Sequence, residues 1–320
     1  MSHELDMTTG QAACAFTGSR ENLWHHLGQE MAEDQPIEEW IVQSGLDWTV
    51  EQSDVAYKAG SKYIQYPDRK VLYRSDTKTP LSVVSKDFKV VQPKQIVEFF
   101  RALVEQHDMK LSTAGSLFGG RKFWALAELG KSAEIVSGDK IDGYLLLTTA
   151  VDGSLRTTGK FVSERVCCQN TLSIALAEGN KTVVAVSHRS EWDAEQVKVD
   201  LGLIDEGWFN FIKKMRKLAE TPITEKQVKS FYQHLIFEEK KLEPTRAELR
   251  KVEKLIDLYQ NGMGADLGRG SAWNALNAVT EMYTHGTGRK DPSAQMWDSL
   301  VVGAQDNLKT KAMNMALALV

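Results

Sequence analysis

Residues 110–129, KLSTAGSLFGGRKFWALAEL, decide the predicted fold together with the two stretches that follow, DGYLLLTTAVDGSLRTTGKFVSERV (142–166) and CCQNTLSIALAE (167–178). The first two stretches read as strand pairs with turns at Gly119-Gly120 and Asp152-Gly153, because these residues adopt turn conformations at little cost. The third reads as a helix. We therefore predict an α+β fold, in which an antiparallel hairpin sheet packs on a central helix.

The flanking sequence extends this prediction to three segments. Residues 1–57 form an acidic N-terminal segment, whose first 35 residues have few apolar positions and are expected to be an arm or an irregular lead-in. Residues 58–190 form the α+β core. Residues 191–320 show only helical periodicity, so we predict a mostly helical C-terminal region.

Within the core, three strand-like runs precede a helix. The runs form a predicted meander, with turns at Pro67-Asp68 and Thr77–Pro80. The stretch PKQIVEFFRALVEQHD (93–108) has apolar residues at helical spacing and Pro93 in its first turn, which predicts a helix.

Composition indicates an ordinary globular chain. It has 320 residues, of which 42% are hydrophobic and 26% charged. Three cysteines are too few for a disulfide framework, so we expect a reducing cytoplasm. The polar start MSHELDMTTG is unlike a signal peptide, and no apolar run approaches the length of a membrane span.

The charge is unevenly distributed. Residues 1–57 hold eleven acidic residues and one basic residue, a net charge of −10, so the remaining chain carries +6 within a total of −4. Such asymmetry is one cue for nucleic-acid contact. An acidic face that is simply solvated explains it equally well.

Basic side chains gather at the predicted turns and strand ends, with hydroxyl residues between them. These cations are Arg121, Lys122, Arg156, Lys160 and Arg165. Cations of this kind contact phosphates, and Trp124, Phe118 or Tyr144 would supply rings for stacked bases. Cations and rings also alternate at 57–63 (YKAGSKY), but we expect most such rings to lie in the core.

The start of the predicted central helix offers a second phosphate site. Asn170 and Thr171 lie there beside Arg165, and free N–H groups at a helix start attract anions. Capping of the helix by these residues is the alternative role. A further basic cluster at 213–217 (KKMRK) is either a solvated helix face or an extension of the same groove.

The sequence shows no recognisable catalytic or cofactor motif. Gly115–Lys122 has the glycine spacing of a phosphate-binding loop, but Arg121 and Lys122 stand where Lys and then Ser or Thr are required. The histidines lack metal-ligand spacing, and the vicinal Cys167-Cys168 lacks a second pair. We therefore expect neither a metal nor a cofactor.

Several short motifs resemble those of the phage/plasmid-like protein family, an uncharacterised group found in bacteriophages, plasmids and integrative elements. The matching motifs include WxxLG (24–28), YRSDT (73–77), FKVVQ (88–92), GGRK (119–122), RVCxQNTL (165–172) and WNALNAVTE (273–281). The resemblance covers nearly the whole chain. The genes of this family resemble those that lie next to viral-type exonuclease genes in recombination cassettes. The order of elements is similar to the core of single-strand annealing proteins of the RecT and Redβ kind.

The resemblance implies a function, which we carry over as an analogy because a fold does not determine a function. We expect a single-stranded DNA-binding and annealing protein of a phage or mobile element. It would act in homologous recombination as a homo-oligomeric ring or filament, without ATP and with a possible partner exonuclease. The alternative is a small-ligand-binding protein or enzyme with a cleft near Asp152, Cys168 and His188. A third possibility is a structural or host-interaction protein.

Overall fold

The computed structural model describes eight ranges of the chain: residues 4–18, 26–107, 109–165, 170–173, 183–196, 204–237, 243–285 and 304–320. The chain divides into two compact units. Unit 1 comprises Met1–Gly130, Leu145–Lys160 and Val183–Gly202, and unit 2 comprises Lys131–Tyr144, Phe161–Thr182 and Leu203–Val320. Each unit combines separate stretches of the chain, and one strand (Val50–Ala59) runs through the expected boundary at residue 57.

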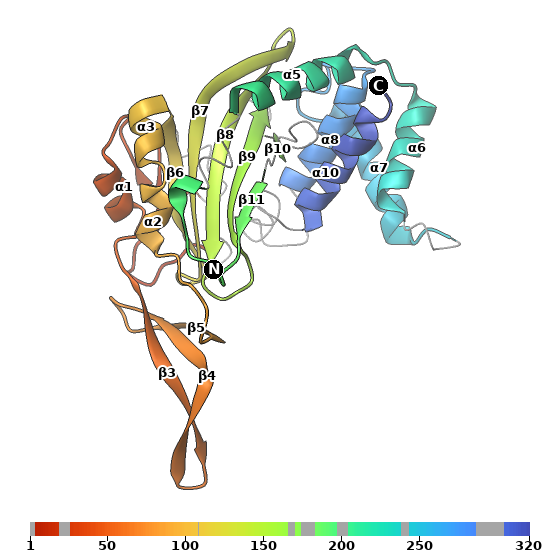
Figure 1. The fold of residues 1–320 in the computed structure, drawn as a ribbon. Helices are drawn as coiled ribbons and strands as arrows, with labels where there is room; N and C mark the ends of the chain where they lie inside the picture. Colours follow the sequence, from red (N-terminus) through yellow and green to blue (C-terminus); the bar gives the residue numbers. More distant parts are fainter. Residues whose placement is uncertain are drawn as a thin grey trace. The chain divides into compact units, whose positions relative to one another are not determined.

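The main sheet confirms the predicted α+β class (Figure 1). Its strand order is β10-β9-β8-β7-β6-β1-β2, and β11 pairs with β9. The strands are β1 (Cys14–Phe16), β2 (Gln29–Glu30), β6 (Lys110–Leu117), β7 (Lys122–Val136), β8 (Asp139–Ala150), β9 (Thr157–Arg165), β10 (Asn170–Ser173) and β11 (Val183–Val186). Both predicted hairpin turns are confirmed, since they join β6 to β7 and β8 to β9.

The expectation of an irregular lead-in over residues 1–35 is wrong for its middle part. β1 pairs antiparallel with β6, and all three of its residues are completely buried. The thiol of Cys14 lies there, and its burial raises its pKa to about 12. This strand is too short for a hydrophobic period to reveal it in the sequence.

A second sheet of three antiparallel strands confirms the predicted meander. It consists of β3 (Val50–Ala59), β4 (Lys62–Arg74) and β5 (Pro80–Ser85). The turn expected at Pro67-Asp68 is wrong: both residues lie within β4, where the register shifts opposite Asp54 and Val55. The bulge accommodates Pro67, which has no backbone N–H to donate, because the residues of the bulge are not paired with β3.

Helices complete unit 1. α1 (Ile37–Gln43) precedes the second sheet, and the predicted helix from Pro93 forms as α2 (Pro93–Glu98) and α3 (Arg101–His107). Gln92 and Gln95 form a capping box that starts α2. Of the apolar positions read from the sequence, Ile96, Val97, Phe100 and Leu103 are buried, and Val104 is half-buried.

Unit 2 is mainly helical, as predicted. Its helices are α5 (Ile204–Glu220), α6 (Glu225–Ile236), α7 (Arg246–Asn261), α8 (Ala272–His285) and α10 (Ala304–Leu317). Thr224 and Thr245 form capping boxes that start α6 and α7. Nearly every residue of α8 is buried, and Trp273 donates from its indole nitrogen to Asp139 over 2.8 Å.

The predicted central helix differs at its start. Residues 170–173 form strand β10, which pairs antiparallel with the end of β9. The four residues NTLS fit a strand as well as a helix by pattern, and the available partner strand decides between them. The remainder of the predicted helix lies outside the described residues.

A buried arginine joins the second sheet to the main sheet within unit 1. Arg74, the last residue of β4, is 1% exposed and forms an ion pair with Asp6, which is 2% exposed. Its guanidinium also donates to both carboxylate oxygens of Asp76 over 3.0 and 2.7 Å, and it lies 4.0 Å from the centre of the Trp48 ring. The hydroxyl of Ser116 donates to Asp6, so the pair connects β4 to β6.

We predict that Arg74→Met lowers the free energy of unfolding by about 3–5 kcal/mol, because it leaves the buried Asp6 carboxylate without its ion-pair partner. Chemical denaturation measures the loss. The exposed Arg69 on the same strand is the matched control, and Arg69→Met should change stability by less than about 0.5 kcal/mol. An equal effect of the two substitutions would contradict the structural role given to Arg74.

A pH dependence follows from Asp76. The hydrogen bonds from Arg74 lower the pKa of this carboxyl below its ordinary value of 3.8. A group whose pKa is lowered by folding stabilises the folded state above its unfolded pKa and loses that contribution as pH falls through the folded value. Thermal unfolding of the wild type should therefore show an acid-dependent loss below pH 3.8 that is smaller in Asp76→Asn.

Candidate nucleic-acid interface

Two turns of unit 1 meet at one end of the main sheet. The backbone N–H of Val151, in the β8–β9 turn, donates to the carbonyl of Arg121 over 2.9 Å. The hydroxyl of Ser82, on β5, donates to the carbonyl of Val151 over 2.6 Å. The β6–β7 turn, the β8–β9 turn and the second sheet are therefore fixed to one another. We call the surface carried by the two turns, residues 118–122 and 151–156, the turn surface.

The β6–β7 turn presents two predicted cations beside a ring. Arg121 is exposed, and its Nε donates to the carbonyl of Phe118 over 2.9 Å. The Nζ of Lys122 lies 5.2 Å from the centre of the Phe118 ring, which is half-exposed. Phe118 has a φ of 57°, a conformation uncommon outside glycine, which turns its side chain out of the strand pattern.

The β8–β9 turn adds the third cation. Arg156 is exposed, and its carbonyl accepts from the hydroxyl of Thr158 over 3.0 Å. The carboxylate of Asp152 accepts from the backbone N–H of Ser154 over 2.9 Å, as in an Asx turn. The structure thus brings Arg121, Lys122 and Arg156 to a common end of unit 1.

Two other predicted site residues have structural contacts instead. Lys160 is 2% exposed, because it lies in the middle of β9 opposite Val183 and not at a strand end. Trp124 lies across from Gly115, where a Cβ would come within 2.6 Å of its ring. Lys160 is therefore inaccessible in this structure, and the Trp124 ring covers a glycine rather than standing clear for a base.

The remaining predicted residues fall in unit 2. Arg165 is the last residue of β9 and pairs through its backbone with Asn170, the first residue of β10. Asn170 and Thr171 do not begin a helix, so the expected anion site at a helix start is wrong. Tyr144 also belongs to unit 2 and is half-buried.

Two members of the basic cluster of α5 form hydrogen bonds within unit 2. Arg216 donates twice to the carbonyl of Glu134, over 3.1 and 2.9 Å, and Lys217 donates to the carbonyl of Val320 over 3.3 Å. Lys213 remains exposed. Because the cluster belongs to unit 2, it stands as a separate feature from the turn surface.

The alternative cleft receives no support from the described residues. Both ring nitrogens of His188 lie near backbone carbonyls, 3.1 Å from Lys89 and 2.9 Å from Leu155, and its ring stacks on Phe88. The carboxylate of Asp152 accepts a hydrogen bond from Ser154 within the β8–β9 turn. The third residue, Cys168, lies outside the described residues.

Sequence reasoning missed the exposed rings of the second sheet. Tyr57, Tyr63 and Tyr66 are 52%, 77% and 45% exposed, although their alternation with cations suggested core positions. The reason is that β3 and β4 extend beyond β5, so neither face of this ribbon is covered. The signal available in the sequence was the absence of any Val, Ile, Leu or Met between Val55 and Ile64.

Two absences hold for the described ranges. In that part of the chain, no group of three or more His, Cys, Asp or Glu side chains is arranged to hold a metal ion. None of the helices placed by the structure has the length and apolar character needed to cross a bilayer.

The chain belongs to the family described as Domain of unknown function (DUF932), whose model matches residues 80–305, more than half of the chain. The match begins at β5 and includes both turns of the turn surface. No curated protein matches the chain. No solved structure matches it either.

The close approach at Gly120 generates a prediction. A Cβ there would lie 2.8 Å from both Arg74 and Trp48, whereas a Cβ on the neighbouring Gly119 meets nothing within 4 Å, and both residues have positive φ. Gly119→Ala should cost about 1–2 kcal/mol of unfolding free energy from backbone strain alone.

We expect Gly120→Ala to cost about 1–3 kcal/mol more than Gly119→Ala, since it adds steric overlap to the same backbone strain. Chemical denaturation of the two variants measures the difference. Equal losses would show that Arg74 and Trp48 move aside without cost, contrary to the rigid turn described here.

Proposed function

We propose that this DUF932 member is a single-stranded DNA-binding and annealing protein of a phage or other mobile element. It acts as a homo-oligomeric ring or filament in homologous recombination, without ATP and with a partner exonuclease. The observation that carries the proposal is the turn surface, on which Arg121, Lys122 and Arg156 gather at one end of unit 1.

The chemistry of the turn surface suits an unpaired strand. Its three cations outnumber its one carboxylate, Asp152, so it attracts phosphates. Gly119 has open space around its Cα, which lets a sugar-phosphate backbone approach closely. The half-exposed ring of Phe118 lies among the cations and offers a face for stacking, which an unpaired base can use more readily than a base within a duplex.

The proposal also agrees with how firmly the turns are held. Hydrogen bonds from Val151 and Ser82 fix the two turns before any ligand binds. Cations on a preformed surface lose less conformational freedom on binding than cations on a mobile loop. The resemblance to RecT and Redβ supplies the annealing step and the exonuclease partner by analogy.

We predict that wild-type protein binds a fluorescein-labelled oligo(dT) with an affinity that falls steeply with salt. The triple variant Arg121→Glu/Lys122→Glu/Arg156→Glu should reduce the magnitude of the negative slope of log K against log [salt] by about 2, because each lost phosphate contact on a single strand contributes about 0.7. Fluorescence anisotropy at several salt concentrations measures both quantities.

The matched control changes three exposed lysines elsewhere, Lys94→Glu/Lys140→Glu/Lys213→Glu, and alters the net charge equally. An equal loss in both triple variants would reduce the effect to net charge and overturn the assignment of the turn surface. Absence of binding by the wild type, even at low salt, would overturn the nucleic-acid function itself. Annealing of complementary strands without nucleotide, followed by fluorescence quenching, tests the second half of the proposal.

A further inference from the structure

The distal part of the second sheet is a two-stranded ribbon without a core. β5 pairs only with Arg69–Tyr73 of β4, so the hairpin beyond it has no third strand. We call residues Val55–Tyr66 the arm. Every residue of the arm is exposed except Val55, which is half-exposed, and Figure 1 shows β3 and β4 extending past β5. A hairpin of this kind has little stability of its own and gains it from a partner.

One face of the arm is apolar. The register places Tyr57 opposite Ile64 and Val55 opposite Tyr66, and alternation along each strand puts these four side chains on the same face. Tyr57 and Tyr66 are about half-exposed, and Ile64 is 42% exposed. Contiguous exposed apolar side chains of this size mark interaction surfaces.

The arm is also basic. It contains Lys58 and Lys62 near its tip and no acidic residue. Lys58 lies opposite Tyr63, and Lys62 lies opposite Ala59, so the two cations flank the turn. A partner that fits the arm therefore combines an apolar surface with negative charge.

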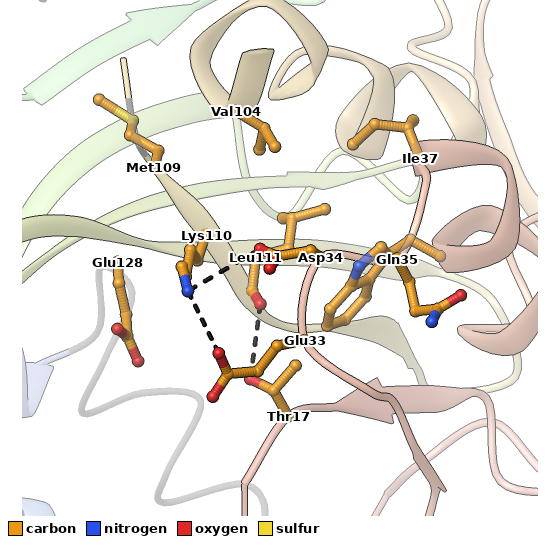
Figure 2. Close-up of a pocket in the computed structure, with 11 residues that line it drawn as sticks. Thr17, Glu33, Asp34, Gln35, Ile37, Val104, Met109, Lys110, Leu111 and Glu128 are labelled. Carbon is orange, nitrogen blue, oxygen red and sulfur yellow. Dashed lines mark hydrogen bonds and ion pairs between the residues drawn. The ribbon is translucent and has the colours of Figure 1, made fainter. Parts of the chain in front are cut away.

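Unit 1 carries a pocket with that combination (Figure 2). Its apolar walls come from Ile37, Trp40, Val104, Met109 and Leu111, and its polar rim includes Glu33, Asp34, Lys110 and Glu128. Three carboxylates face one ammonium, so the rim is negative. We call it the acidic pocket.

The rim of the acidic pocket is open to solvent. Lys110 lies 3.2 Å from Glu33 and 3.8 Å from Asp34, and both carboxylates are more than three-quarters exposed. The hydrogen bond that Lys110 donates to Glu33 raises the pKa of Lys110, so the ammonium stays charged and compensates only part of the rim. The space inside is about 80 Å³, which holds several waters or the end of one side chain rather than a nucleotide.

The arm and the acidic pocket lie at opposite ends of β6. The pocket includes Lys110 and Leu111, where β6 begins, whereas Arg74 at the base of the arm contacts Gly120, just after β6 ends. The eight residues of β6 separate these ends by roughly 23 Å at about 3.3 Å per residue. A donor and an acceptor at opposite ends of one unit are the arrangement that joins copies head to tail.

We propose that the arm of one copy binds the acidic pocket of a second copy. Lys62, on the same face as Tyr57 and Ile64, and Lys58, beside the turn on the other face, lie near the rim carboxylates at the tip of the arm, and the apolar face of the arm covers the apolar wall. Because the two surfaces differ, the contact is heterologous and repeats into a ring or filament. The inference rests on the assembly part of the proposed function and is independent of DNA binding.

Sedimentation velocity without nucleic acid tests this contact. Wild type should form assemblies, whereas Lys58→Glu/Lys62→Glu and Glu33→Lys/Glu128→Lys should each sediment as a monomer at the same concentration. A chain with all four substitutions should assemble again, because an acidic arm then meets a basic pocket. All four side chains are exposed, so folding is not expected to change, and circular dichroism checks it.

The control variant Lys94→Glu/Lys213→Glu has the same change in charge as the arm variant and should assemble like wild type. A cysteine pair gives direct evidence of proximity: Tyr63→Cys in one chain and Asp34→Cys in another should form a disulfide-linked dimer on mixing, and neither variant alone should. The native Cys14 is buried, and Cys167 and Cys168 are replaced by Ser in both chains, so that native thiols contribute no background.

Three results would overturn the inference: a wild type that is monomeric at every concentration, assemblies that neither charge reversal affects, or no rescue in the fourfold variant. Loss of oligo(dT) binding in the arm variant with an unchanged assembly mass would assign the arm to DNA instead. Failure of DNA binding with intact arm-dependent assembly would leave this inference standing and remove only the DNA part of the proposed function.

Discussion

The buried ion pair between Arg74 and Asp6 is the constraint on which the rest of unit 1 depends. A guanidinium at 1% exposure is tolerated only when its hydrogen-bonding groups are satisfied, and here two carboxylates and the face of Trp48 provide for it. The pair leaves no space for a side chain at residue 120. The glycine pair read from the sequence as a turn signal is therefore also a steric requirement of the ion pair.

This constraint connects the turn surface to the arm. Gly120 lies within the turn surface, and the second strand of the arm is the start of β4, the strand that Arg74 ends. Both surfaces thus take their position from a common rigid point, and neither depends on a mobile loop. The acidic N-terminal segment contributes to the same frame, since Asp6 lies within the pair and Glu51 forms a salt bridge with Lys78. Its charge serves internal contacts as well as the exposed rim of the acidic pocket.

The sequence predicted what local pattern determines. Gly119-Gly120 and Asp152-Gly153 identified the hairpins, the helical spacing after Pro93 identified α2 and α3, and the α+β class followed. It failed where distant partners decide the outcome: residues 170–173 became a strand because the end of β9 was available.

For the candidate site, the sequence identified the cations but not their exposure. Arg121 and Arg156 are exposed as expected, whereas Lys160 is buried because its position along β9, invisible in a list of charges, places it between strands. The tyrosines of the arm are the opposite case, because they are exposed although their pattern suggested core positions. Alternation predicts two faces of a strand, but it does not say whether either face is covered.

The bulge at Pro67 has a consequence for the resistance of the protein to aggregation at high concentration. A ribbon with two unpaired edges is a template for indiscriminate strand addition, the route to fibrous aggregates. Pro67 withholds an N–H from the edge, the bulge increases the local twist, and the lysines of the arm place like charges on approaching copies. Backbone-to-backbone growth is thereby discouraged, and what remains attractive is recognition through side chains.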